Sequence, residues 1–111
     1  MTESANHNVY FVPGLSRGLS VLEILGTAEN PMSLSEIARA MDLSRSSVFR
    51  LVYTLRHMEF IKEGEQKNTY TLGAQVLNLG FAYLKFQSNI DQQYFQHTFL
   101  HTIFQRTFLY Y

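Results

Sequence analysis

The sequence contains no cysteine, only two prolines among its 111 residues, and no formal net charge at pH 7. Without cysteine, neither a disulfide framework nor a zinc–thiolate site can form. No apolar run approaches the roughly 18 residues that a membrane-spanning helix requires. The polar N-terminus, MTESANHNVY, also lacks the apolar core of a signal peptide. We therefore expect a soluble, cytoplasmic protein.

The sequence also lacks the residue patterns of an enzyme. It has no Ser/His/Asp set with familiar spacing, no glycine-rich phosphate loop and no prominent pair of carboxylates, so we expect neither catalysis nor a cofactor. His97 and His101 would share one face of a helix, but Asp91 is the only nearby carboxylate, and a metal site needs further ligands. No metal site is predicted.

The chain is long enough for about one domain. Its charged residues are unevenly distributed along the sequence. Hydrophobic residues make up 46% of the sequence, which is enough to form a core. The neutral net charge argues mildly against a nucleic-acid partner, but the distribution of charge matters more than its sum. Arg45, Arg50 and Arg56 fall in a segment, 44–58, that contains no acidic residue. The basic charge is therefore concentrated on one predicted helix.

The segment from Leu34 to Leu51 has the pattern of a helix-turn-helix. Ser33 and Glu36 form a capping box before a helix over 34–41, Asp42 and Leu43 make the turn, and Ser44 caps a second helix that extends to about residue 58. The exposed face of the second helix carries arginines and serines, which is the chemistry of a major-groove reader. The residues that occupy the positions the motif requires are Ala38, Leu43, Ser44, Val48 and Leu51.

Apolar spacing predicts the elements around this motif. Ser16 can cap a first helix over about 17–28, and short strands over 60–63 and 69–72 flank a polar loop over 64–68. The fold is therefore predicted to be mainly α with a small β-hairpin, a winged helix-turn-helix followed by a linker helix over 74–85. The predicted core-facing residues are Leu15, Leu19, Leu22, Ile24 and Leu25 in the first helix, Leu34, Ile37, Ala38 and Met41 in the second, and Val48, Leu51, Val52 and Leu55 in the third.

The predicted domain organisation has four parts. These are an N-terminal arm over 1–12, a winged helix-turn-helix DNA-binding domain over 13–73, a linker or dimerisation helix over 74–86, and an atypical aromatic tail over 87–111. The arm is expected to be poorly ordered at its start. The linker helix is apolar almost all round, so it requires a partner. We expect it to pair with its counterpart in a homodimer through Leu77, Phe81 and Leu84.

From Val12 to about Leu84 the sequence resembles the DNA-binding half of IclR-family transcriptional regulators. The resemblance rests on LSRGL and VLE in the first helix, LSEIA in the second, LSRSSVFRL in the third, FI and YTLG in the hairpin and VLNLG in the linker helix. It implies a dimeric regulator that binds an inverted-repeat operator in double-stranded DNA near a promoter. Regulators of this type usually carry a larger domain that senses a small metabolite.

The chain departs from the family pattern at two places. The residues after about 88 do not resemble the start of the sensor domain, so the small-molecule effector site is expected to be missing, and the tail is interpreted as a truncated remnant. Glu59 stands where the family usually has glycine after the third helix. If that position requires a left-handed backbone, glutamate costs on the order of 1 kcal/mol.

The third helix and the wing provide the candidate DNA contacts. Arginine can pair with guanine or phosphate, serine with phosphate or base edges, and an exposed phenylalanine with a thymine methyl group. Phe49 could instead pack against the wing, and Arg17 could tie the first helix into the domain rather than contact phosphate. The predicted DNA-binding residues are Arg45, Ser46, Ser47, Phe49, Arg50, Tyr53, Arg17, Lys62 and Lys67.

Two other functions remain open at this point. A winged helix can use the same helix face to bind a protein, which would suit the neutral net charge. The chain could also be a non-functional truncated product that aggregates through its aromatic tail. A gel shift with competitor DNA across salt concentrations separates the first alternative from DNA binding, and size-exclusion chromatography with and without residues 87–111 separates the second.

Overall fold

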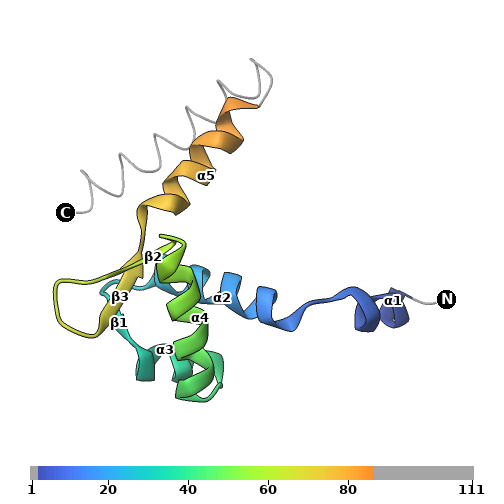
Figure 1. The fold of residues 1–111 in the computed structure, drawn as a ribbon, viewed down its shortest axis with the longest axis horizontal. Helices are drawn as coiled ribbons and strands as arrows, with labels where there is room; N and C mark the ends of the chain where they lie inside the picture. The colour runs from blue at the N-terminus through green and yellow to red at the C-terminus, as the bar shows by residue number, and fades with distance from the viewer. Residues whose placement is uncertain (1–2, 87–111) are drawn as a thin grey trace. The chain divides into compact units, whose positions relative to one another are not determined.

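The computed structural model describes residues 3–86 (Figure 1). Its elements, in chain order, are α1 (Glu3–Tyr10), α2 (Pro13–Thr27), β1 (Met32–Ser33), α3 (Leu34–Met41), α4 (Arg45–His57), β2 (Ile61–Glu63), β3 (Thr69–Leu72) and α5 (Ala74–Lys85). Contacts divide the chain into two units, 1–75 and 76–111, so the boundary lies inside α5. The predicted tail over 87–111, with His97 and His101, lies outside the described residues.

The helix-turn-helix consists of α3 and α4, and side-chain caps fix the start of each. At α3 the Ser33 amide donates to Glu36 Oε1 at 3.0 Å, and the Glu36 amide donates to Ser33 Oγ at 3.2 Å, which confirms the predicted capping box. The hydrogen bond from the Ser33 backbone is the main cause that lowers the pKa of the Glu36 carboxyl. Between the helices, Asp42 turns the chain in a left-handed conformation with φ 54°. Ser44 then caps α4, as predicted.

The end of α4 brings a glutamate into a left-handed backbone conformation. Glu59 has φ 69°. Its amide donates to the Arg56 carbonyl at 3.0 Å, and the Phe60 amide donates to the Leu55 carbonyl at 2.9 Å. This pair of hydrogen bonds is the Schellman motif, in which glycine is the usual residue at the left-handed position. A Cβ on Gly73 would overlap the Glu59 carbonyl oxygen, so this turn is also closely packed by the backbone that precedes α5.

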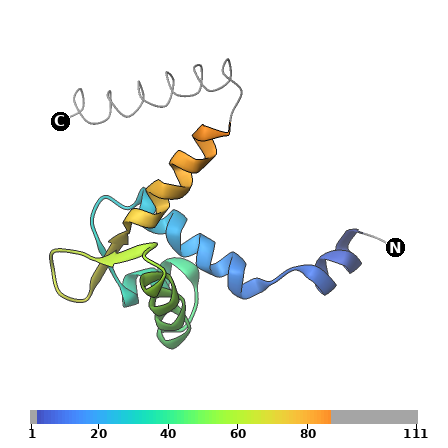
Figure 2. The ribbon, with the colours of Figure 1, turned by 45° about the horizontal axis from the view of Figure 1, so that its top comes forward.

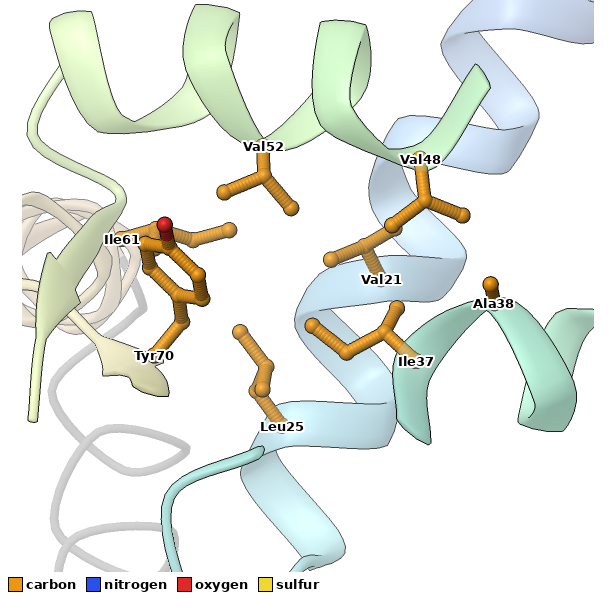
Figure 3. Close-up of a cluster of buried hydrophobic side chains, with 8 residues drawn as sticks. All are labelled: Val21, Leu25, Ile37, Ala38, Val48, Val52, Ile61 and Tyr70. Atoms are coloured by element: carbon orange, nitrogen blue, oxygen red, sulfur yellow. The ribbon is translucent and has the colours of Figure 1, made fainter. Parts of the chain in front are cut away.

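The core lies where α2, α3, α4 and the sheet meet (Figure 3). α4 lies across one side of the cluster and presents two valines to it, while the sheet supplies an isoleucine and a tyrosine. Burying such a cluster is the main stabilising contribution in a domain of this size. The buried side chains are Val21 and Leu25 from α2, Ile37 and Ala38 from α3, Val48 and Val52 from α4, Ile61 from β2 and Tyr70 from β3.

Several side chains that were predicted to face the core are less buried than expected. Leu51 and Leu55 of α4 are only half-buried against the cluster, because the residues of this helix that face the core are Val48 and Val52. Leu15 and Leu19 of α2 are 65% and 52% exposed. Of the predicted apolar residues of α2 only Leu25 is buried, and the other two buried residues of the helix, Gly18 and Val21, were not predicted to face the core. Leu22, Leu34 and Met41 pack against the core without being fully buried, and Ile24 is half-buried.

The wing is part of a three-stranded antiparallel sheet with strand order β1-β3-β2. The predicted hairpin strands are present, with Ile61 opposite Leu72, and the loop between them extends outward from the sheet (Figure 2). β1 was not predicted; it has only two residues, and Met32 pairs with Tyr70 of β3. A Cβ on Gly64 would lie 2.7 Å from the side chains of Pro31 and Thr69, so only glycine fits at the start of the wing loop.

The N-terminal region differs from the prediction in two ways. The segment predicted as an arm contains α1, which carries no strong apolar periodicity and was therefore not predicted. α2 begins at Pro13 with Val12 as its N-cap residue and no side-chain cap, so Ser16 lies inside the helix and does not start it. Proline is favoured at the first helical position because its missing amide would have no partner there.

Candidate nucleic-acid interface

A serine network orients the start of α4. Ser44 Oγ accepts a hydrogen bond from the Ser47 amide at 3.2 Å and donates to Ser47 Oγ at 2.8 Å. The Ser46 hydroxyl lies 3.3 Å from the same Ser44 oxygen. The N-cap therefore fixes both predicted serines at the exposed start of the helix. Ser47 still has hydrogen-bonding capacity, but its hydroxyl is shared with the cap.

The exposed face of α4 carries positive charge without compensating acids. Arg45 and Arg50 are exposed, and their guanidinium groups form no hydrogen bond or ion pair with any residue between 3 and 86. Arg56, near the other end of the helix, differs because its Nη2 lies 3.3 Å from Glu63 Oε2. Val48 and Val52 are buried almost opposite Arg50 around the helix axis, and Arg45 is exposed as the first residue of α4. Both uncompensated arginines therefore lie at the surface.

Two aromatic rings lie beside these arginines. Phe49 and Tyr53 stand one turn apart with ring centroids 6.1 Å apart and an interplanar angle of 37°. They are 50% and 65% exposed. Phe49 thus has Tyr53 as its ring neighbour, and half of its surface remains open. An exposed apolar surface between cations suits contact with thymine methyl groups or sugars.

The wing is tied to α4 by one carboxylate that sequence reasoning did not single out. Glu63 Oε2 pairs with Arg56, and Glu63 Oε1 accepts from the Asn68 amide at 3.1 Å. Only the folded hairpin brings these groups together, so the sequence offered no local signal. Lys62 and Lys67 are exposed on the wing, and neither has an ion-pair partner among the described residues. They remain available to bind phosphate.

Arg17 shares a cleft with residues of α4. A cleft of about 320 Å³ is lined by Gly14, Arg17, Ser47, Arg50, Leu51 and Thr54. The Thr54 hydroxyl donates to the Arg50 carbonyl at 2.9 Å and is therefore occupied within α4. Arg17 forms no hydrogen bond or ion pair with another described residue. The structure places it near Arg50.

Other kinds of site find no support in the part of the chain that the structure describes. Among residues 3–86 no group of three or more His, Asp or Glu side chains could hold a metal ion. Within the same range, no helix has the length and apolar character needed to cross a membrane.

The predicted dimerisation residues lie on α5, where Leu77 and Phe81 are 58% and 60% exposed and Leu84 is half-buried.

Comparisons with known proteins agree with this geometry. Residues 14–64 match the IclR helix-turn-helix domain. The chain is 30% identical over 73 residues to the glycerol operon regulatory protein of Streptomyces coelicolor, a match that covers 66% of this chain and 29% of that protein. It is 33% identical over 70 residues to the HTH-type transcriptional repressor AllR of Escherichia coli, covering 63% of this chain and 26% of the repressor.

Solved structures agree as well. An IclR-family transcriptional regulator from Brucella abortus is 34% identical with a TM-score of 0.62, over 68% of this chain and 29% of that one. The IclR protein of Thermotoga maritima, at 24% identity and a TM-score of 0.61 over 84% of this chain and 36% of its own, shares the fold. The chain spans less than a third of the length of the curated relatives. Residues 14–64 therefore form an IclR-type helix-turn-helix domain.

Proposed function

We propose that the chain binds double-stranded DNA sequence-specifically as a transcriptional regulator and has no catalytic role. The observation that carries this proposal is the outward face of α4, where Arg45 and Arg50 have no ion-pair partner among the described residues. A desolvated or buried arginine would need an acid, whereas a DNA-binding arginine must be free for phosphate or guanine. The related repressor and the glycerol operon regulatory protein support the same function by their names.

The geometry supports two kinds of DNA contact on this surface, contacts to bases and contacts to phosphates. α4 enters the major groove, where Arg45, Ser46 and Phe49 meet base edges and sugars and Tyr53 reaches a phosphate. Lys62 and Lys67 on the wing, with Ser47 at the helix start, meet the phosphates beside the groove. Phosphate contacts supply a large part of the affinity and make it depend on salt, and base contacts supply the choice of sequence.

Selection of bound duplexes from a random DNA pool, followed by fluorescence anisotropy titration, tests this function. Arg45→Ala should weaken binding to the selected duplex by about 1–3 kcal/mol if Arg45 contacts a base. Arg39→Ala, which removes the same charge from the exposed surface of α3, is the matched control and should leave the affinity close to that of the parent. Equal losses in both variants would indicate non-specific electrostatics. No enrichment in the selection would favour the protein-interaction alternative.

We further propose that two copies pair through α5, so that two copies of α4 meet a near-palindromic site. No residue of α5 is buried, although most of its residues are apolar. Pairing would cover Leu77, Phe81 and Leu84. In that arrangement the half-sites lie one or more helical turns apart, about 34 Å per turn. Leu77→Glu with Phe81→Glu should reduce the stoichiometry from two chains to one per duplex in sedimentation, and a parent that binds strictly as one chain per palindromic duplex would contradict the dimer.

A further inference from the structure

The cleft between the N-terminal part of α2 and α4 has an unusual lining. Two cationic side chains, Arg17 and Arg50, line it, and no acidic residue does. Both side chains are exposed, and neither has a hydrogen-bond or ion-pair partner among residues 3–86. A cleft lined by charges of one sign concentrates counter-ions. Two guanidinium groups that share a cleft repel each other, and an anion between them removes that repulsion.

Gly14 adds an independent observation. It lies in the first turn of α2 with an ordinary negative φ, so its backbone conformation does not require glycine. A Cβ built on it would meet no atom within 4 Å, so protein packing does not require glycine either. Glycine nevertheless lowers the stability of a helix relative to alanine. Its place in the cleft lining offers a reason, because a missing side chain lets a ligand approach the backbone closely.

We propose that this cleft binds a single phosphate of the DNA backbone, with Arg17 and Arg50 as its two cationic ligands and Gly14 leaving the space that the phosphate occupies. The proposal rests on the proposed function of DNA binding and assigns Arg50 to the backbone rather than to a base. The planar donors of arginine match the oxygens of phosphate in paired hydrogen bonds. Base reading then falls to Arg45, Ser46 and Phe49.

A mixed-sequence duplex of about three helical turns is a sufficient probe, because phosphate contacts do not depend on sequence. We would measure its affinity for the parent, Arg17→Ala, Arg50→Ala and the double variant by anisotropy across a series of KCl concentrations. Each single variant should bind about tenfold more weakly. Because both arginines hold one phosphate, the double variant should be little weaker than either single one. Its slope of log affinity against log salt should fall by about 0.9 in magnitude, not by about 1.8.

Gly14→Ala separates a ligand space from a structural role. It should raise the melting temperature, because alanine lowers the conformational entropy of the unfolded chain and fits the helix without a clash. It should also weaken binding to the same duplex several-fold. The control is Gly18→Ala, a buried α2 glycine that also has no atom within 4 Å of a Cβ built on it and that does not line the cleft. This control should preserve DNA affinity.

The results separate the proposal from the function on which it rests. Additive losses in the two arginine variants, with a slope change near 1.8, would mean two separate phosphates and would overturn the shared site. Unchanged affinity in a stabilised Gly14→Ala variant would overturn the assigned space. If the parent binds no duplex even at low salt, DNA binding itself is wrong and the phosphate site is wrong with it. Parent binding with a non-additive double variant and a weakened Gly14→Ala supports the site.

Discussion

Replacing Glu59 with glycine should stabilise the domain. Glu59 has φ 69°, in the left-handed region, at the end of α4. Three residues other than glycine have a positive φ in the described part of the chain, and the other two are Asp42 and Asn68. Asparagine and aspartate adopt this conformation several-fold more readily than other residues, whereas glutamate has no such preference. Glu59 is therefore the strained one of the three.

The magnitude follows from three terms. A left-handed backbone costs a residue with a Cβ about 1–2 kcal/mol. Relieving this strain with glycine would stabilise the folded state, but glycine also raises the conformational entropy of the unfolded chain. This second effect lowers the stability by about 0.4–1 kcal/mol. Removing a carboxylate from the C-terminal end of a helix adds about 0.3 kcal/mol or more. We therefore expect a net stabilisation of about 1 kcal/mol, which is a rise of roughly 4–8 °C in melting temperature for a domain of this size.

Thermal and urea unfolding of the parent, Glu59→Gly, Glu59→Gln and Asp42→Gly would test this reasoning. Glu59→Gln removes the charge and keeps the strain, so it should recover only the smaller electrostatic part. Asp42→Gly replaces a residue type that adopts the left-handed conformation readily, so it should change the stability little. The Schellman hydrogen bond from the Phe60 amide to the Leu55 carbonyl, 2.9 Å long, joins backbone atoms that none of these substitutions removes. A Glu59→Gly variant that melts at or below the parent would refute the assignment of strain to this residue.

Two further predictions concern the core and the α3 cap. Ile37 is fully buried, so Ile37→Ala should cost about 2–5 kcal/mol, and Leu51→Ala should cost clearly less because Leu51 is half-buried; equal losses in urea unfolding would contradict the observed core. The pKa of Glu36 is lowered from 4.5 in the folded state, so its stabilisation is complete above that value and is lost as pH falls through the lower folded pKa. Stability measured between pH 7 and pH 2 should therefore decline less steeply in Glu36→Gln than in the parent.

Local signals predicted the helices well where a cap or a long apolar pattern was present. α3 was placed correctly because its start is encoded by the four-residue box from Ser33 to Glu36. α5 was placed correctly because an apolar run follows Gly73. The start of α2 was misplaced because Val12 caps it without a side-chain hydrogen bond, so the helix carries no polar marker at that point. β1 was missed because a pair of residues is too short to show alternation.

Burial was harder to predict than secondary structure. α2 has apolar residues on more than one side, so its sequence pattern is compatible with several orientations. Packing against α3, α4 and β3 selects the side with Val21 and Leu25 and leaves Leu15 and Leu19 exposed. On α4 the choice between Leu51 and Val52 depends on where the neighbouring helices approach. These outcomes are properties of the assembled core, and no single helix contains the information.

The same distinction separates the two parts of the candidate interface. Part of the outward face of α4 could be predicted, because helical periodicity places Arg50 almost opposite Val48 whatever surrounds the helix. Arg45 lies three residues before Val48, on the same side of an ideal helix, and is exposed as the first residue of α4. The partners of that face could not. Glu63 meets Arg56 only when the hairpin folds back on α4, and Arg17 joins Arg50 only when α2 packs beside it. Because these contacts join distant segments, they decide which arginine is neutralised within the protein and which two arginines remain together, free to bind an anion.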